Sequence, residues 1–195
     1  MNGFERRKKL KQKHILEAAL TLFLEYGVQK VSIAEIAEKA NVSQVTIYNY
    51  FESKDNLVTE VVNYYVDKIW AEYESLFQSD VPFPEKIKQI VFEKKIIADD
   101  IHEDFFNHFM QEYIEEDSYL RQFYINTALP SFIQLFNEGK QQGYIDENLS
   151  DEAIIMYLQM YADFMRREDV YEQILPLTED LTKMFFYGIA GKHRD

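Results

Sequence analysis

Cysteine is absent from this sequence of 195 residues, so the protein can form neither a disulfide nor a thiolate metal site. No apolar stretch approaches the roughly 20 residues that a membrane-spanning helix needs. The N-terminus is charged and no apolar segment follows it, so we expect no signal peptide. These absences fit a reducing cytoplasm, which is the compartment that we expect.

The strand-like alternation of apolar and polar residues is also absent, and apolar residues recur at helical spacing instead. They make up 47% of the chain, which is enough for one core-forming unit or two modest ones. The sequence therefore predicts an all-α protein with about nine helices.

Motifs of the common enzyme classes are missing: there is no Gly-rich phosphate loop, nucleophile elbow or zincin pattern. We therefore expect no enzymatic activity and no cofactor. One polar set remains, because Asp104, His108 and Glu112 share a helix face and have the spacing of ligands for a divalent metal ion. A solvated polar face opposite Phe105 and Phe109 explains the same pattern, and we favour that interpretation.

The net charge of −13 is distributed unevenly along the chain. Residues 1–56 carry nine basic and seven acidic side chains, whereas residues 57–195 carry twelve and twenty-seven. Within residues 1–14 a single acid accompanies six bases, namely Arg6, Arg7, Lys8, Lys9, Lys11 and Lys13. A basic arm on an acidic body favours contact with phosphate at the basic end. An ordinary solvated tail is the alternative interpretation.

Residues 32–51 predict two short helices joined by a tight turn. Ser32 is a good N-cap, and Glu35 three residues later completes a capping box. The first helix has an apolar face formed by Ile33, Ile36, Ala37 and Ala40. Asn41 follows, and asparagine tolerates the left-handed conformation that ends many helices.

The second of these helices combines an apolar back with a polar front. Ser43 caps it, and Ile47 and Phe51 lie four residues apart on one side. The exposed side carries Gln44, Val45, Tyr48 and Asn49. Such amides pair with base edges and an apolar group meets a thymine methyl, so this helix suits a DNA major groove. Lys54 then opens a third helix, whose N-terminus favours a phosphate.

Many of these residues form one extended pattern: Phe23-x2-Tyr26-Gly27, Ser32-Ile33-x2-Ile36-Ala37 and Val42-Ser43-x2-Thr46-Ile47-Tyr48-x-Tyr50-Phe51-x-Ser53-Lys54-x2-Leu57. The pattern covers about a third of the chain and resembles the N-terminal domain of the TetR/AcrR family of bacterial transcriptional regulators. That family usually has glycine where Asn41 stands and often a small residue where Val45 stands. The base sequence that the helix reads therefore stays open.

The resemblance implies a DNA-binding helix-turn-helix domain over residues 1–56 and an effector-binding and dimerisation domain over residues 57–195. A first helix over residues 9–26 would cover the helix pair and complete a three-helix head. The resemblance assigns DNA contacts to Ser32, Ser43, Gln44, Val45, Thr46, Tyr48, Asn49, Tyr50 and Lys54.

The remaining helices follow from periodicity and from breaks. A long amphipathic helix is expected over residues 54–78, and the segment Ser79–Pro84 ends it. Pro130 should kink or divide a helix over residues 118–142. Ser150 opens the next helix. A last helix begins near Val170 or Pro176.

Residues 57–195 are rich in Tyr, Phe and Met, and each buried Tyr hydroxyl needs a partner. A plain core is the ordinary explanation, but a partly apolar cavity with polar handles accounts better for the tyrosines. The resemblance also implies such a cavity. The residues expected to line it are Tyr65, Ile69, Tyr73, Phe105, Phe109, Tyr113, Phe132, Met156, Met160 and Phe164. The acidic surroundings favour a neutral or cationic effector.

In the family, the last two long helices pair across a two-fold axis as a four-helix bundle. The apolar residues expected at this interface are Ile154, Leu158, Tyr161, Met165, Leu181, Met184 and Phe185. The same residues could be enclosed within one subunit, but a reader of two half-sites needs two heads, so we favour a homodimer.

The protein is expected to be a transcriptional regulator that binds operator DNA as a homodimer. Its simplest mode of action is repression that ends when a small amphipathic molecule releases the protein from the operator. Activation stays open as an alternative mode. The competing hypothesis is an all-α enzyme or scaffold with an incidental helix-turn-helix. It would need polar residues that converge in the C-terminal part, and the sequence offers no evident set.

Overall fold

The computed structural model describes residues 3–165, 167, 170 and 173–190, and all regular structure in these ranges is helical. This confirms the all-α prediction. The elements are α1 (Gly3–Tyr26), α2 (Ile33–Lys39), α3 (Gln44–Phe51), α4 (Lys54–Phe77), α5 (Phe83–Asp100), α6 (Glu103–Ile114), α7 (Tyr119–Phe123), the π-helix η1 (Tyr124–Ala128), α8 (Leu129–Gln141), α9 (Asp151–Met165), the 3-10 helix η2 (Leu175–Leu177) and α11 (Thr178–Ala190). No described helix is long and apolar enough to cross a membrane.

The chain forms two compact units. Unit 1 comprises Met1–Lys68 and Asp100–Glu112, and unit 2 comprises Ile69–Asp99 and Tyr113–Asp195. The sequence placed the domain boundary after residue 56, whereas the units divide within α4 and α6 joins unit 1. The assignment of DNA binding to residues 1–56 and of effector binding and dimerisation to residues 57–195 stays a prediction.

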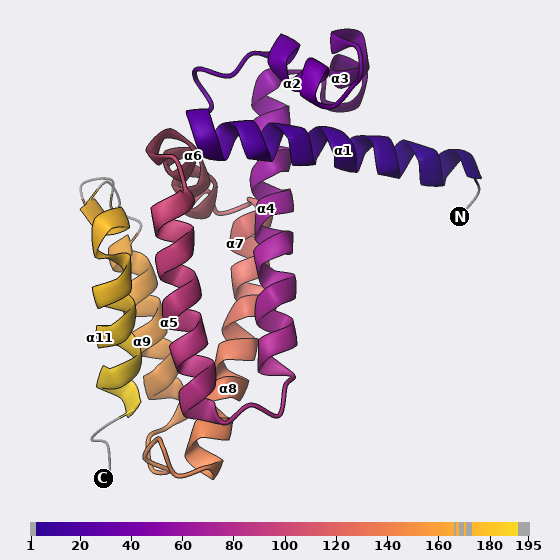
Figure 1. The fold of residues 1–195 in the computed structure, drawn as a ribbon. Coiled ribbons are helices and arrows are strands. Elements are labelled where there is room, and N and C mark those ends of the chain that lie inside the picture. Colours follow the sequence, from indigo (N-terminus) through magenta and orange to yellow (C-terminus); the bar gives the residue numbers. More distant parts are fainter. Residues whose placement is uncertain (1–2, 166, 168–169, 171–172, 191–195) are drawn as a thin grey trace. The chain divides into compact units, whose positions relative to one another are not determined.

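Unit 1 is built around α1, which crosses the N-terminal half of α4 (Figure 1). Its core contains Phe23, which is fully buried and stacks on Phe105 of α6 at 6.1 Å between ring centroids. The Tyr65 ring of α4 meets Phe105 edge-on at 5.7 Å. These ring contacts explain why α6 belongs to unit 1 although it follows α5 in the sequence.

Three residues with positive φ set the connections around α2 and α3. Gly27 (φ 80°) ends α1, and a Cβ at this position would lie 2.8 Å from the His102 ring. Asn41 (φ 53°) makes the turn between α2 and α3, as the sequence predicted. Glu52 (φ 65°) ends α3, and the sequence did not predict a glutamate with a positive φ at this position.

Pro130 divides the expected helix of residues 118–142 in the way that its chemistry requires. Ser118 caps α7, and a π-helical stretch (Tyr124–Ala128) precedes α8, in which Pro130 is the second residue. Proline lacks an N–H group, so it is tolerated in the first turn of a helix. With the interrupted segment 119–141 taken as one helix, the described residues form nine helices.

Unit 2 has a core to which α4, α5, α8, α9 and α11 all contribute. In Figure 1, α5, α9 and α11 run alongside one another. The most buried core residues include Ile90 of α5, Phe136 of α8 and Ile154 of α9. Several large side chains pack against this core but are only partly buried, namely Ile69, Trp70, Phe77, Leu129, Phe132, Leu149, Tyr157 and Tyr161.

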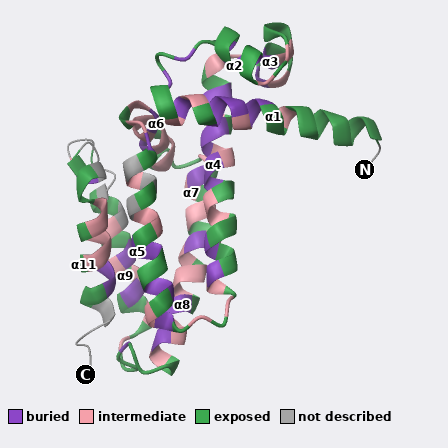
Figure 2. Ribbon diagram, in the orientation of Figure 1, coloured by how far each residue is buried: buried purple, intermediate pink, exposed green. Residues whose placement is uncertain are grey.

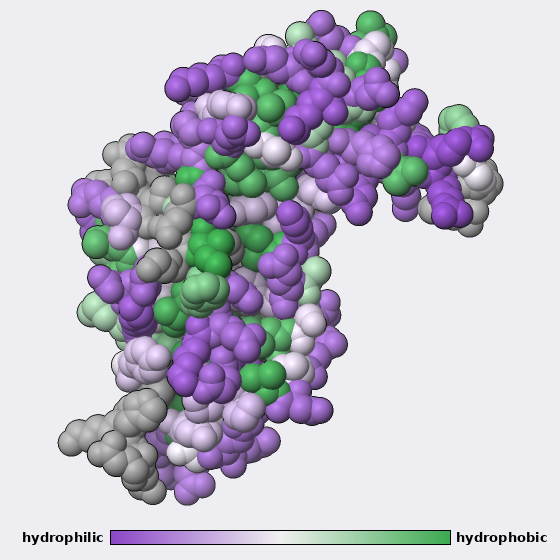
Figure 3. Space-filling view, in the orientation of Figure 1, coloured by the Kyte–Doolittle hydropathy of each residue, from purple (hydrophilic) through white to green (hydrophobic). Residues whose placement is uncertain are grey.

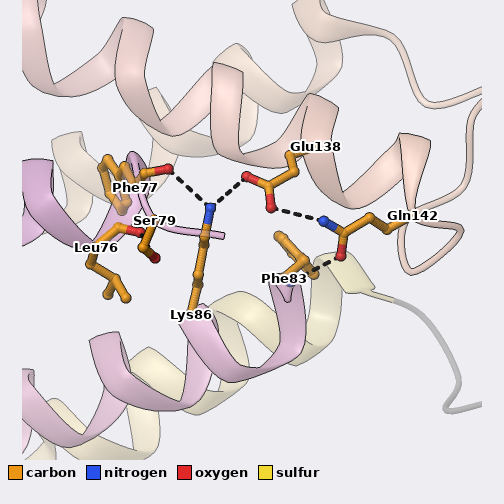
Figure 4. Close-up of polar contacts among 7 residues, drawn as sticks. All are labelled: Leu76, Phe77, Ser79, Phe83, Lys86, Glu138 and Gln142. Atoms are coloured by element: carbon orange, nitrogen blue, oxygen red, sulfur yellow. Dashed lines mark hydrogen bonds and ion pairs between the residues drawn. The ribbon is translucent and has the colours of Figure 1, made fainter. Parts of the chain in front are cut away.

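A buried lysine joins three helices of unit 2 (Figure 4). The Nζ of Lys86 donates to the carbonyl oxygen of Phe77 at 2.9 Å and forms an ion pair with Glu138 at 2.8 Å. Gln142 donates to the same carboxylate at 2.8 Å and accepts from the Phe83 amide at 3.0 Å. The end of α4, the start of α5 and the end of α8 are thereby tied together, and the Lys86 ammonium has two acceptors.

Candidate DNA interface and ligand-binding interior

The outward face of α3 is polar because its apolar residues are used in the core. Ile47 and Phe51 are 1% and 3% exposed, whereas Gln44, Tyr48 and Asn49 are exposed on the opposite side. Val45 is exposed as well and adds one apolar group to this face. The arrangement matches the face that the sequence predicted, and its amides lie free to meet base edges.

Two serines position α2 and α3 through their caps. Ser32 and Glu35 form the predicted capping box, with the Ser32 amide donating to the Glu35 carboxylate at 2.7 Å. The Ser43 Oγ accepts from the Thr46 amide at 3.1 Å and lies 2.8 Å from the Thr46 hydroxyl oxygen. Ser32, Ser43 and Thr46 therefore fix the helix ends, while Tyr50 is half-buried beside Phe51.

Lys54 has an internal role that the sequence did not reveal. Its Nζ donates to the carbonyl oxygen of Val28 at 2.7 Å and ties the start of α4 to the α1–α2 connection. An ammonium has three donors, so a phosphate contact would be made in addition to this bond. The predicted phosphate contact stays a prediction.

Residues of α6 hold the same part of unit 1. Asp104 accepts from the Gln29 amide at 2.8 Å, and Glu112 accepts from the Thr59 hydroxyl at 2.7 Å. Among the described residues no group of three or more His, Asp or Glu side chains is arranged to hold a metal ion. The set of Asp104, His108 and Glu112 is therefore not supported as a metal site, because two of its carboxylates serve as hydrogen-bond acceptors within unit 1.

The basic N-terminal segment is helical rather than a loose arm. We expected the first helix to begin near residue 9, but α1 begins at Gly3. Residues 3–14 are exposed apart from Gln12, and burial starts at Ile15 (Figure 2). In Figure 3 this part of α1 is mostly hydrophilic with a few apolar atoms. The six bases therefore project from a helix whose C-terminal half is anchored in unit 1.

The residues predicted to line one pocket do not come together. Phe105 (0% exposed) and Tyr65 (8%) are core residues of unit 1, and Phe109 stacks on Phe106 in the same unit. The pocket prediction is wrong for Phe105 and Tyr65, because their rings fill the α1–α4–α6 packing. Three further predicted residues lie on the outer side of α9 with exposed fractions of 47% to 70%, namely Met156, Met160 and Phe164, and their place in a pocket stays a prediction.

The other predicted residues, Ile69, Tyr73, Tyr113 and Phe132, belong to unit 2, where half-buried rings form a connected set. Ring centroids lie 5.8 Å apart in the pair Trp70–Phe77, 5.3 Å in Phe77–Phe132 and 5.4 Å in Trp70–Phe123. The sequence did not single out Phe123, whose π-helical neighbourhood has no clear periodicity.

Two tyrosines add polar groups to this interior. The rings of Tyr113 and Tyr124 meet edge-on at 5.8 Å. Burial raises the pKa of each hydroxyl to about 12. Both hydroxyls therefore stay protonated at neutral pH and can donate hydrogen bonds. Arg121 lies over the Tyr124 ring, with its guanidinium carbon 5.8 Å from the centroid.

The predicted dimer face is wrong for the most apolar residues of the last helices. Ile154, Leu158 and Phe185 are 1%, 9% and 7% exposed and belong to the core of unit 2, because this side of α9 and α11 packs against α8 and α5. Tyr161 packs on Phe185 with ring centroids 5.0 Å apart. Leu181 is half-buried, and the Met165 side chain lies outside the described residues.

The outer faces of α9 and α11 are apolar as well. Their large exposed residues are Met156, Met160, Phe164, Met184 and Tyr187, with exposed fractions between 47% and 70%. Only Met184 of the predicted interface residues belongs to this set. We call these five residues the outer apolar face.

Comparison with known proteins agrees with the helix-turn-helix geometry. The family model "Bacterial regulatory proteins, tetR family" matches residues 15–61. The uncharacterized HTH-type transcriptional regulator YuxN of Bacillus subtilis is 33% identical over 105 residues, which are 53% of this chain and 35% of that protein. The chain thus spans about a third of the length of this curated relative.

Two solved structures share the fold over nearly the whole chain. FadR from Bacillus subtilis in complex with stearoyl-CoA has a TM-score of 0.59 at 19% identity and covers 93% of this chain and 99% of its own. FadR from Thermus thermophilus in complex with lauroyl-CoA has a TM-score of 0.55 at 18% identity, with coverage of 93% and 96%. The family model therefore identifies residues 15–61 as the DNA-binding part of a tetR-family regulator, and the two structures show that the whole chain shares their fold.

Proposed function

We propose that this protein is a dimeric repressor that binds operator DNA through α3 and is released by a small amphipathic ligand. The observation that carries the DNA-binding part is the outward face of α3. Gln44, Tyr48 and Asn49 are exposed there, while Ile47 and Phe51 anchor the helix from behind. A helix held in this way presents two amides and a hydroxyl to the major groove without losing core contacts.

The basic helix segment of residues 3–14 supports the same function. Its exposed lysines and arginines would neutralise phosphates and release the counterions bound there. This release favours binding less at high salt, so the affinity for DNA should fall as the salt concentration rises. The function requires the cytoplasm, where operator DNA is accessible.

Dimerisation is supported by the outer apolar face. Methionine and aromatic side chains that are 47% to 70% exposed on two adjacent helices are typical of a protein interface. A two-fold dimer would cover this face and provide two copies of α3 for two half-sites. The predicted four-helix bundle is retained in this proposal, but with the outer residues of α9 and α11 at its centre.

The effector proposal is supported by the half-buried rings of unit 2 and by the two relatives of like fold whose structures contain acyl-CoA molecules. An acyl chain or another apolar group suits the ring set that includes Trp70, Phe77 and Phe132. Because α4 supplies residues to both units, a ligand that shifts its C-terminal half could change operator affinity. The ligand acts only through its different affinity for the two states.

The test of DNA binding is an electrophoretic mobility shift with the protein's own upstream region at two salt concentrations. Replacing Gln44 or Asn49 with Ala should cost about 1–3 kcal/mol of binding free energy and relax preference at one base pair. Gln78→Ala, at an exposed position beyond the end of α4, is the matched control and should change neither. If both α3 variants retained full affinity and preference, the assignment of α3 would be wrong and an all-α enzyme or scaffold would become the better hypothesis.

A further inference from the structure

Two lysines of α5, Lys86 and Lys94, have different surroundings in unit 2. Lys86 is satisfied by the Phe77 carbonyl and the Glu138 carboxylate. The Nζ of Lys94 lies over the ring of Tyr73, 5.7 Å from its centroid, and no hydrogen bond or ion pair joins this ammonium to another residue that the structure describes. Tyr73 is a core residue of unit 2, so Lys94 points toward the interior rather than away from it.

Three other described lysines of unit 2 differ from Lys94. Lys88, Lys140 and Lys183 each form an ion pair of 2.7 Å or shorter with a carboxylate. Arg121 forms no ion pair with a described carboxylate either, but it is half-exposed in the last turn of α7. In a chain with 34 acids and 21 bases, an inward-pointing lysine with no carboxylate partner among the described residues is unusual.

The surroundings of Lys94 disfavour its charge in the ligand-free protein. Burial lowers the pKa of the Lys94 amine, and this effect is larger than the opposite effect of the neighbouring Glu93 charge, which raises the pKa. Burial also raises the pKa of Glu93, and the charge of Glu72 adds to that rise. A desolvated ammonium without a strong acceptor is costly, and an anion that replaced the lost water would remove that cost.

Lys94 is half-buried as a residue, and burial dominates the surroundings of its amine. The ring centroid of Tyr73 lies 6.5 Å from that of Trp70, and the Trp70 ring in turn contacts the rings of Phe77 and Phe123. A cation at one end of a half-buried aromatic surface suits a molecule with one negative group and one apolar part.

We infer that Lys94 is the anion-binding residue of the effector site and that the effector is an anionic amphiphile whose apolar part packs on the ring set of Trp70, Phe77 and Phe132. This inference rests on the proposed function and makes it more specific. It replaces the neutral or cationic effector that the net charge favoured, because a local cation overrides an average field. A carboxylate and a phosphate offer the same chemistry to Lys94.

The experiment measures binding of three probes to the full-length chain by titration calorimetry. Dodecanoate carries a carboxylate, lauroyl-CoA carries phosphates, and dodecanamide has the same chain length without charge. Wild-type protein should bind at least one anionic probe about 10- to 100-fold more tightly than dodecanamide, as a charge-assisted hydrogen bond would give. The probe with the larger ratio identifies whether the negative group is a carboxylate or a phosphate.

Three variants connect that ratio to Lys94. Lys94→Met should reduce it to less than about threefold, Lys94→Arg should retain most of it, and Lys88→Met on the exposed side of α5 should leave it unchanged. Lys94→Met should melt close to the wild type without ligand, because the substitution removes a desolvated charge while it loses the contact with the Tyr73 ring. Equal binding of charged and neutral probes by the wild type, binding of none, or a ratio that Lys94→Met retains would each overturn the inference.

Operator release is measured separately with the same probes. If only dodecanamide released the operator, the inference would fail and the ligand-responsive repressor would stand. If an anionic probe bound through Lys94 without releasing the operator, the inference would stand and the proposed switching function would fail.

Discussion

The helix α3 in unit 1 and the helix α9 in unit 2 both bury an apolar face, but their exposed faces differ in polarity. Ile47 and Phe51 bury one side of α3, and Ile154 and Leu158 bury one side of α9. The exposed side of α3 carries amides and a tyrosine, whereas that of α9 carries Met156, Met160 and Phe164.

This difference indicates the kind of partner that each front can accept. Amides exposed to water are satisfied already and gain specificity from base edges. Exposed methionine and phenylalanine gain free energy only when another apolar surface removes them from water. The buried face of each helix stabilises its packing in the unit, and the exposed face determines what the folded unit can bind.

The largest expected effect tests this division on α9. Leu158→Glu places a carboxylate in the core of unit 2 and should destabilise the protein by on the order of 4 kcal/mol or prevent folding. Met160→Glu changes the exposed side two residues later, so the protomer should remain folded while a dimer loses about 2 kcal/mol of association free energy. Urea unfolding and light scattering over a concentration series measure the two quantities.

Tyr144→Glu provides the control, since Tyr144 is an exposed aromatic residue outside α9 and α11. It should leave association unchanged, and loss of the Tyr144 ring contact with Phe83, at 6.2 Å between centroids, should appear only in the unfolding free energy. A monomeric wild-type protein at micromolar concentration, or a Met160→Glu variant that associates like the wild type, would contradict the proposed interface.

The sequence predicted the back and front of α3 correctly because local signals determine both. Caps at Ser32 and Ser43 define where α2 and α3 begin, and Asn41 defines the turn between them. Only two large apolar residues of α3 share a face, so one orientation buries them. The all-α fold and the family followed from the same local patterns.

The orientation of α9 was not predictable in this way, because both of its sides are apolar. Periodicity cannot distinguish Leu158 from Met160 when either side would make a core. Only packing against α5 and α8 decides that Ile154 and Leu158 face inward. The contacts of Lys54 with Val28 and of Asp104 with Gln29 were equally invisible, since partners 26 and 75 residues apart leave no periodic signal.

On α3, the corresponding test gives an intermediate effect. Ile47→Ala removes a side chain that is 1% exposed and should cost about 2–4 kcal/mol of unfolding free energy, with loss of DNA binding as a consequence. Gln44→Ala should leave unfolding unchanged and weaken operator binding alone. Chemical denaturation beside mobility shifts separates the two outcomes. A loss of stability in Gln44→Ala would show that its side chain supports the fold and does not face a partner freely.

A smaller effect is expected at Lys54, where fold and phosphate contact overlap. Lys54→Met removes the bond to the Val28 carbonyl and should lower the unfolding free energy by about 1 kcal/mol. A residue that served phosphate alone would instead leave stability unchanged and flatten the salt dependence of binding by about one unit. Lys39→Met, at an exposed position in the last turn of α2, is the matched control for stability.

The smallest expected effect concerns the bonds that hold the start of α9. Asp151 accepts from Lys140 at 2.7 Å and from Asn137 at 3.1 Å, and these two bonds tie α9 to α8. The bond from Lys140 and then that from Asn137 hold the pKa of Asp151 below its usual 3.8. Because the folded pKa is the lower one, the carboxylate contributes stability above pH 3.8 and loses it as the pH falls through the folded value.

Comparison of the wild type with Asp151→Asn isolates this contribution from the other carboxylates. The wild type should melt slightly higher at pH 7, and the difference should shrink as the pH is lowered toward 3. The effect is small because the ion pair is partly exposed, so salt should reduce it further. A melting difference that stayed constant from pH 7 to pH 3 would show that the asparagine disturbs α9 by another route, and the side of α9 that faces the core would then depend on packing alone.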